Sequence, residues 1–366
     1  LRRRILERLL CVLSGMNRGG AETFLMKIDR SLDHSKYQMD FCINVKEKCA
    51  YEDEIISLGG KIFRIPMKTE SAVKFKKGLY SVVKDNHYKN VLRITSNAAG
   101  FWDLKIAKEA GAKHTIARSS NASDGGRIRS ILAHKIGQML WMKYVDTMIA
   151  PSDLAAMYTF GEKNYKDGRV YKLNNGLDLN AYRFDIEKRK MIRMKYNIPQ
   201  DAIVLGHVGR FAKQKNHTFL IQVFASYIKK HPNSYLMLIG DGDLRAEIQR
   251  QVANVGLTDN IIFVGQTDEI AAYLSAMDVF VFPSLYEGMP NTVIEAQASG
   301  LPCVISDTIT KEANVSGSVS YLAINHPEQW ADYIAEINLE RNINVDMSVY
   351  DIKKVVKKFI DLCYLN

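Results

Sequence analysis

The feature that most constrains the fold of this chain is a regular alternation of short apolar runs with segments long enough to form helices. Six such runs occur in the first half, at positions 9–13, 37–44, 61–65, 90–94, 114–117 and 147–150. Six more follow in the second half, at positions 202–207, 234–239, 260–264, 279–283, 302–306 and 319–322. Apolar strands that alternate with helices are typical of parallel sheets covered on both faces. The sequence therefore predicts an α/β protein with two doubly wound, Rossmann-like sheets.

Polar and charged residues replace this periodicity over 174–199, which indicates the join between the two sheets. We expect a first domain over 1–182 and a second domain over 183–345. The last segment, 346–366, carries apolar residues at helical spacing and predicts an amphipathic closing helix that packs back toward the first domain. Ligands bind at the carboxyl ends of parallel strands. Each domain should therefore present its loops along one edge, and the two edges should face a central cleft.

The net positive charge is confined to the first half of the chain. Residues 1–185 carry 32 Lys and Arg against 20 Asp and Glu, whereas residues 186–366 carry 18 against 20. A basic half suggests an anionic partner, such as nucleic acid, an anionic membrane leaflet or a phosphate-bearing substrate. A basic surface that only keeps the chain soluble would give the same count. No recognition helix or set of RNP aromatics is present, so we expect no nucleic-acid partner.

The sequence also limits the compartment and the cofactors. Five cysteines are scattered without a CxxC pair, and three of them lie within or beside apolar runs, as free buried thiols do, which predicts a reducing compartment. No Cys/His grid or HExxH motif indicates a metal. No run of 18 apolar residues occurs. We therefore expect a cytoplasmic protein whose basic half makes peripheral, salt-reversible contact with an anionic membrane; the candidate contacts are Lys74, Lys76, Lys77, Arg127 and Arg129.

The strongest chemical signal is the stretch PSLYEGMPNTVIEA at 283–296. Pro290 suits the first position of a helix, whose amides would form a site for an anion such as a diphosphate. Glu287 lies in the preceding loop and Glu295 about one turn inside the helix. We therefore expect the two carboxylates to accept hydrogen bonds from hydroxyls at two ends of one ligand. The alternative is a capped helix with two solvated glutamates. The amides expected to point out of the helix start belong to Asn291, Thr292 and Val293.

A second signal follows the first strand of the second half, in the stretch GHVGRFAKQKN at 206–216. Gly209 makes a turn there, and Arg210 and Lys215 lie just beyond it. Cations on a loop at the carboxyl edge of a sheet suit phosphate oxygens, although ordinary surface charge would look the same.

Two glycine turns complete the pattern. Gly240 and Gly242 follow the next strand and would let the backbone approach a ligand closely. Near the start of the chain, Gly19 and Gly20 would expose amides at a helix start to an anion, or would form only a tight turn.

Together these motifs resemble the GT-B glycosyltransferases, specifically family 4 of the retaining, nucleotide-sugar-dependent enzymes, and among them members that make capsular polysaccharide and exopolysaccharide. The resemblance covers nearly the whole chain in order, through MNRGGAETFLM, AYEDEIISLGGKIFRIP, NNGLDLNAYRF, GHVGRFAKQKNHTFL, LIGDGDL and AMDVFVFPSLYEGMPNTVIEAQASGLPCVISDTITKEA. It implies that a hexose moves from a nucleotide sugar, expected to be UDP-linked, to a lipid-linked oligosaccharide at the inner face of the cytoplasmic membrane. It implies neither a metal nor another cofactor.

The resemblance also implies roles at matching positions. Arg210 and Lys215 would hold the donor diphosphate and stabilise it as it leaves, and Glu287 would contact hydroxyls of the donor sugar. Glu295 would bind the ribose. The remaining implied donor-binding positions are Gly19, Gly20, Gly209, Gly240, Gly242, Val264, Gly265, Gln266, Gly288, Met289, Pro290, Asn291 and Thr292. The Asp241-Gly-Asp243 stretch formally matches a DxD metal motif, but in the family pattern it is the glycine turn.

The chain departs from the family at four positions where relatives often carry histidines, and these read Arg93, Thr95, Arg118 and Ser120. The resemblance implies front-face attack in which the leaving phosphate takes the acceptor proton, so a protein base is not obligatory. The departure therefore concerns the acceptor side, where the candidates are Arg93, Arg118 and Asn121. Arg118 would bind an acceptor phosphate or serve as a structural cation at a strand end.

The missing histidines leave one competing function from another class. The chain could be an inactive nucleotide-sugar-binding paralogue that acts as a partner subunit of another glycosyltransferase. A sugar-nucleotide epimerase with the same fold is less favoured, because the stretches at 209–215 and 287–295 match the transferases.

Overall fold

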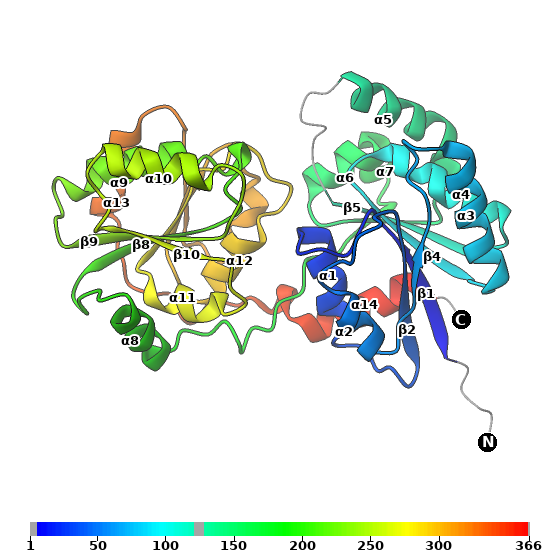
Figure 1. The fold of residues 1–366 in the computed structure, drawn as a ribbon, viewed down its shortest axis with the longest axis horizontal. Helices are drawn as coiled ribbons and strands as arrows, with labels where there is room; N and C mark the ends of the chain where they lie inside the picture. Colours follow the sequence, from blue (N-terminus) through cyan, green and yellow to red (C-terminus); the bar gives the residue numbers. More distant parts are fainter. Residues whose placement is uncertain (1–5, 121–127, 365–366) are drawn as a thin grey trace. The chain divides into compact units, whose positions relative to one another are not determined.

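The computed structural model describes residues 6–120 and 128–364, and the chain divides into two compact units (Figure 1). Leu1–Leu177 and Ser348–Asn366 form the first unit, and Asp178–Met347 form the second. The boundaries expected after residues 182 and 345 lie close to the two places where the chain passes between the units.

The first unit is built on seven parallel strands in the order β3-β2-β1-β4-β5-β6-β7. All six apolar runs of the first half form strands, and a seventh strand at the edge escaped the sequence pattern because its three residues are mostly exposed. The strands are β1 (Glu7–Val12), β2 (Tyr37–Ile43), β3 (Ile62–Arg64), β4 (Asn90–Thr95), β5 (His114–Ser119), β6 (Thr147–Ala150) and β7 (Val170–Lys172).

Helices cover both faces of this sheet, which explains why its central strands are continuously apolar. Leu9 and Cys11 of β1 pack into one buried cluster, whereas Leu10 and Val12 pack into another. Successive strand residues point to opposite faces, so both faces of β1 are buried. The helices are α1 (Gly20–Asp29), α2 (Glu52–Ser57), α3 (Ala72–Asp85), α4 (Phe101–Glu109), α5 (Ile128–Trp141), α6 (Asp153–Phe160), α7 (Glu162–Lys166) and α14 (Ile352–Cys363), with 3-10 turns η1 (Ala98–Gly100), η2 (Met142–Tyr144) and η5 (Ser348–Tyr350).

The closing helix α14 belongs to the first unit although it ends the chain (Figure 1, red). It packs against α1, where the rings of Phe24 and Phe359 meet edge to face at 6.1 Å between centroids. Beyond the helix, the Tyr364 hydroxyl donates to the carbonyl oxygen of Gln38 at 3.2 Å. One cluster of the first core therefore contains residues from both ends of the sequence.

The second unit has six parallel strands in the order β10-β9-β8-β11-β12-β13, and these are the six runs expected from the sequence. The strands are β8 (Ile203–Val208), β9 (Ser234–Ile239), β10 (Ile261–Gly265), β11 (Val279–Phe282), β12 (Cys303–Ser306) and β13 (Val319–Leu322). The helices are α8 (Ile186–Lys195), α9 (His217–Ile228), α10 (Arg245–Asn254), α11 (Ile270–Ala276), α12 (Asn291–Ala298) and α13 (Pro327–Glu336), with 3-10 turns η3 (Lys213–Lys215) and η4 (Lys311–Ala313).

All five cysteines are buried and unpaired, including the three for which the sequence predicted it. In the described part of the chain, no helix is both long and apolar enough to cross a membrane.

Candidate functional site

Three loops of the second unit lie side by side at the carboxyl ends of β8, β9 and β10. The amide of Gly209 donates to the carbonyl oxygen of Ile239 at 2.9 Å, and the amide of Phe211 donates to that of Asp241 at 3.0 Å. The loop after β10 joins them, because the amide of Gly240 donates to the carbonyl oxygen of Gly265 at 2.9 Å. These bonds bring four of the glycines selected from the sequence to one edge of the sheet.

Gly240 and Gly242 are required by this close approach. Their φ angles are +133° and +155°, which side chains rarely permit. A Cβ on Gly240 would lie 2.1 Å from the carbonyl oxygen of Gly209, and one on Gly242 would lie 2.6 Å from that of Phe211. Glycine therefore lets the backbones of two neighbouring loops touch.

The other residues expected near a nucleotide surround these loops. Arg210 is exposed, and no described residue forms an ion pair or hydrogen bond with its guanidinium. Gly265 ends β10 with φ +85°; Val264 before it is half-buried and Gln266 after it is exposed. Arg210 is therefore accessible to a ligand at this edge.

Lys215 and Glu287 come together from the loops that follow the adjacent strands β8 and β11. Nζ of Lys215 lies 2.7 Å from Oε1 of Glu287, and the two side chains are 19% and 11% exposed. The same carboxylate oxygen accepts from the Ser284 hydroxyl at 2.6 Å and from the Gln214 amide at 3.2 Å. Nζ also lies 4.7 Å from the centre of the Phe282 ring, which favours a cation. The position of the Lys215 ammonium is thus fixed by the carboxylate and the ring.

Two histidines that the sequence reasoning missed lie behind Lys215. His217 begins α9, stacks on Phe211 at 4.1 Å and meets His207 edge to face at 4.7 Å. Burial, with the charge of Lys215 adding to it, lowers the pKa of His217 to about 4, and burial lowers the pKa of His207 well below its usual value. Both imidazoles are therefore neutral at pH 7. The position of His217 two residues after Lys215 was the available signal.

We expect His217 to make stability depend on pH. Its folded pKa lies below the unfolded value of about 6.5, so the unfolded chain binds a proton first and stability falls as pH drops from about 6.5 to 4. Between pH 7.5 and 4.5 the free energy of unfolding should fall, and replacing His217 by Phe should make that fall smaller by up to about 2 kcal/mol. Urea unfolding at the two pH values measures this difference, and the exposed His326→Gln variant should keep the original loss. Equal losses in His217→Phe and the unmodified chain would contradict the assignment.

The start of α12 differs in one detail from the sequence prediction. Pro290 precedes the helix, and Asn291 is its first residue. The amide of Val293 donates to the carbonyl oxygen of Pro290 at 3.1 Å, so it is already used and was wrongly assigned to an anion site. Asn291 and Thr292 are half-buried. The three preceding residues, all buried, are Gly288, Met289 and Pro290.

Glu295 is held inside the second unit. It is 8% exposed, and the hydroxyl of Tyr182 forms a hydrogen bond with its side chain. Burial and this carboxylate raise the pKa of Tyr182, which stays protonated as the donor. With Glu287 also largely buried, the alternative of two solvated glutamates does not fit the structure.

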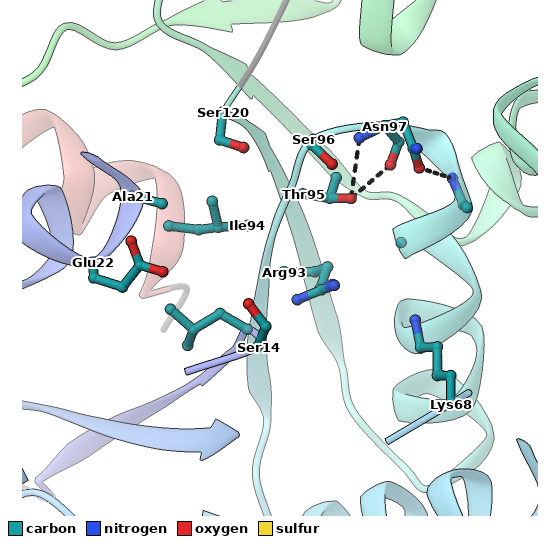
Figure 2. Close-up of a pocket in the computed structure, with 13 residues that line it drawn as sticks. Ser14, Ala21, Glu22, Lys68, Arg93, Ile94, Thr95, Ser96, Asn97 and Ser120 are labelled. Carbon is teal, nitrogen blue, oxygen red and sulfur yellow. Dashed lines mark hydrogen bonds between the residues drawn. The ribbon is translucent and has the colours of Figure 1, made fainter. Parts of the chain in front are cut away.

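The first unit contains a polar cavity of about 300 Å³ at the carboxyl ends of β1 and β4 (Figure 2). It is lined by three of the four positions at which the resemblance led us to expect histidine, namely Arg93, Thr95 and Ser120. Glu22 lines it too, and Figure 2 shows Arg93 between Glu22 and Lys68. Hydroxyls and both signs of charge make this cavity suitable for a polar ligand such as a sugar.

Arg93 belongs to a buried ion cluster that the sequence did not reveal. Its Nε lies 2.9 Å from Oδ2 of Asp103, and its Nη1 donates to the carbonyl oxygen of Val12 at 2.9 Å. Lys68 lies 2.5 Å from the other oxygen of Asp103, which is 1% exposed. Asp103, in the following helix α4, was the available sequence signal for this ion pair.

Gly19 and Gly20 lie where α1 begins, as expected, with Gly20 as its first residue. Glu22 folds back over them, because a Cβ on Gly19 would lie 2.4 Å from its Oε2. Burial raises the pKa of this carboxyl group. The helix start therefore already faces a carboxylate of its own first turn.

Arg118 is 2% exposed, and its guanidinium lies 3.7 Å from the centre of the Phe24 ring. Its Nη2 donates to Oδ1 of Asn175 at 2.5 Å, and no described carboxylate pairs with it. Burial lowers its pKa to about 9, so it is charged at pH 7. This placement favours the structural cation over a contact with acceptor phosphate. Asn121 lies outside the described residues.

The formal DxD match forms a turn. Oδ1 of Asp241 accepts from the amide of Gly242 at 2.9 Å and lies 3.6 Å from Nη1 of Arg245, and Asp243 is exposed. Within residues 6–120 and 128–364, no group of three or more His, Cys, Asp or Glu side chains is placed to hold a metal ion.

Comparison with solved structures assigns the fold that these two units define. HepE from Anabaena, whose crystal structure contains UDP and glucose, superimposes with a TM-score of 0.78 over 96% of this chain and 98% of its own, at 16% identity. The chain has the GT-B fold of glycosyltransferases, as the sequence predicted.

Sequence comparison identifies the family. The model of glycosyl transferases group 1 matches residues 202–338, which contain the Lys215–Glu287 pair. EpsF of Bacillus subtilis, named as a glycosyltransferase, is 36% identical over 90% of this chain and 87% of its own length. The UDP-Gal:alpha-D-GlcNAc-diphosphoundecaprenol alpha-1,3-galactosyltransferase of Escherichia coli is 27% identical over 77% of this chain and 74% of its own. The chain belongs to the group 1 glycosyl transferases.

Proposed function

We propose that this protein is a retaining glycosyltransferase that moves a hexose from a UDP-sugar to a lipid-linked oligosaccharide during synthesis of a surface polysaccharide. The observation that carries the proposal is the fixed Lys215–Glu287 pair, at the same sheet edge as the touching glycine loops and the accessible Arg210.

The geometry suits departure of a nucleoside diphosphate. Glu287 accepts one N–H of Lys215, and the ammonium has two others to give to a donor phosphate. Together with Arg210, it would neutralise the charge that grows on the leaving diphosphate. The bond from the anomeric carbon to that phosphate breaks as the acceptor oxygen bonds to the same face of the carbon. The leaving phosphate takes the acceptor proton, so no protein base is needed.

The names of the relatives support the choice of substrates. HepE was crystallised with UDP and glucose, and the name of the Escherichia coli relative specifies a UDP-sugar donor and a diphosphoundecaprenol-linked acceptor. We assign the cavity of the first unit to the acceptor sugar, because Glu22, Arg93 and Thr95 can bind hydroxyls there.

A lipid-linked acceptor would be met at the inner face of the cytoplasmic membrane, where the basic first half would make peripheral contact. Among the five charges selected for that contact, Lys74, Lys76, Lys77 and Arg129 are exposed. Lys76 is paired with Glu109 at 3.1 Å, and Arg127 lies outside the described residues.

A panel of nucleotide sugars tests the donor. The correct UDP-sugar at a hundred times its dissociation constant should add about 2.7 kcal/mol to stability, read as a rise in melting temperature. The same sugar should then release UDP slowly without acceptor, at an unchanged rate in EDTA, and NMR of the transferred product should show the donor's anomeric configuration.

The outcomes separate the candidate functions. Donor binding with neither UDP release nor transfer to any lipid-linked glycan would favour the inactive partner subunit. An inverted product would contradict retention, and loss of activity in EDTA would contradict metal independence.

A further inference from the structure

The cations that line the cavity of the first unit outnumber the acid that holds them. Asp103 is 1% exposed and does not line the cavity, yet its carboxylate oxygens lie 2.9 Å from Nε of Arg93 and 2.5 Å from Nζ of Lys68. Arg93 and Lys68 do line the cavity, and their side chains are 15% and 33% exposed. Two cations therefore share one carboxylate, and the unbalanced positive charge lies at the cavity wall.

Arg93 and Lys68 are both held in place before any ligand arrives. Nε of Arg93 faces the shared carboxylate and Nη1 donates to the carbonyl oxygen of Val12, but neither N–H of Nη2 has a hydrogen-bond partner among the described residues. Nζ of Lys68 lies 4.8 Å from the centre of the Phe75 ring and 5.7 Å from that of the Trp102 ring, and both rings favour its charged form. A fixed guanidinium with an open edge is suited to bind a carboxylate.

The rest of the cavity wall carries an acid and hydroxyl groups. Figure 2 shows the carboxyl group of Glu22 across the cavity from Lys68, with Arg93 between them. Glu22 forms no ion pair with Arg93 or with any other cation in the described part of the chain. Ser14 and Ser96, which also line the cavity, are exposed. The cavity is thus suited to a sugar ring that has an anionic substituent toward the cations and hydroxyls toward Glu22.

We infer that the acceptor sugar carries a carboxylate, so that the acceptor of this enzyme ends in a uronic acid. The sugar carboxylate pairs with Arg93 and Lys68, and a ring hydroxyl donates to Glu22. A carboxylate brings a charge of about −1, which matches the unbalanced charge. A phosphate brings about −1.5 to −2 and is repelled more strongly by Glu22.

The sugar carboxylate orients the ring and takes no part in the bonds that form and break. Arg93 and Lys68 therefore determine specificity for the acceptor. The inference rests on the proposed function, because that function assigns the cavity to the acceptor sugar.

Three sugars that differ only at C6 test the charge: methyl glucoside, methyl glucuronide and methyl glucoside 6-phosphate. In NMR titrations with the full chain and UDP, Kd should be at least about tenfold lower for the glucuronide than for the glucoside, because a charge-assisted hydrogen bond contributes on this scale. This preference should shrink as salt is raised. The same three substituents on methyl galactoside make the test independent of the stereochemistry at C4.

Single substitutions then locate the preference. Arg93→Gln and Lys68→Gln each remove the unbalanced charge and leave Asp103 paired with the other cation, so both should lower the preference to within about threefold. Arg93→Lys keeps the charge and should retain part of the preference, which a merely structural role of Arg93 does not predict. The matched control Lys89→Gln removes an exposed cation that precedes β4, at the opposite edge of the sheet, and should keep the full preference.

The outcomes distinguish this inference from the proposed function. Equal affinity for the acidic and neutral glycosides in both series, or no binding of either uronide, overturns the inference. Tighter binding of the 6-phosphates than of the uronides overturns it as well and assigns the cations to phosphate. A normal melting shift with UDP in every variant, without a preference for the carboxylate, refutes this inference alone. Absence of any shift with UDP would count against the proposed function instead.

Discussion

Replacing Lys215 by Gln is expected to lower the turnover number by about 10²- to 10³-fold, because a preorganised cation that stabilises leaving-group charge contributes on this scale. Arg210→Ala should have an effect of the same order. The Lys215 ammonium is held by Glu287 and the Phe282 ring before any donor arrives, so little reorganisation is needed during the reaction. Steady-state kinetics with saturating donor measures the change.

The control for this prediction lies in the same 3-10 turn. Lys213 is exposed two residues away, and Lys213→Ala should keep turnover within about twofold because a solvated charge contributes little. Circular dichroism and melting temperature verify folding, since Glu287 loses a partner in Lys215→Gln but keeps Ser284 and Gln214. Normal turnover in both Lys215→Gln and Arg210→Ala would refute the diphosphate assignment.

The two glutamates should separate nucleotide binding from sugar binding. Glu295→Ala is expected to lower the affinity for UDP by about 10- to 150-fold. This is the equivalent of about 1.5–3 kcal/mol for a hydrogen bond to a charged group. Glu287→Ala should leave UDP as tight as before or tighter, because it frees Lys215 for phosphate. Glu287→Ala should instead lower the affinity for the intact UDP-sugar, relative to the affinity for UDP, by a similar factor. Isothermal titration with UDP and UDP-sugar measures both ratios.

Tyr182→Phe is the matched control for Glu295. It removes the hydroxyl that holds the Glu295 carboxylate but keeps the carboxylate itself. The affinity for UDP should therefore fall less than in Glu295→Ala. Equal losses of UDP affinity in Glu287→Ala and Glu295→Ala would rule out the division of roles.

The periodic apolar runs were enough to predict both sheets, because strands covered on both faces have few polar positions. The same reasoning missed the helix α8, because it lies within 174–199, which we interpreted as a polar linker between the two sheets. Arg193 of α8 is fully buried, and its guanidinium bonds the carbonyl oxygens of Ala202 and Ala276 and the carboxylate of Asp278. A helix attached through an arginine has no apolar stripe that periodicity could detect.

The candidate site was only partly predictable for a related reason. Sequence placed Lys215 and Glu287 in loops at one sheet edge. Their ion pair depends on β8 and β11 being neighbouring strands, although 72 residues separate Lys215 from Glu287 along the chain. Arg118 was open to two interpretations because nothing local shows that Phe24 and Asn175 enclose it. Burial created by long-range packing was the missing information in each case.

The return of α14 to the first unit has a consequence for synthesis on the ribosome. Residues 1–177 emerge first, the complete second unit follows, and Phe359 with its helix emerges last. Domains generally fold as units while a chain is made, at about 5–20 residues per second. The second unit can therefore fold while the apolar side of α1 around Phe24 is still uncovered. For the seconds needed to make residues 178–363, the nascent first unit presents the kind of surface that chaperones bind.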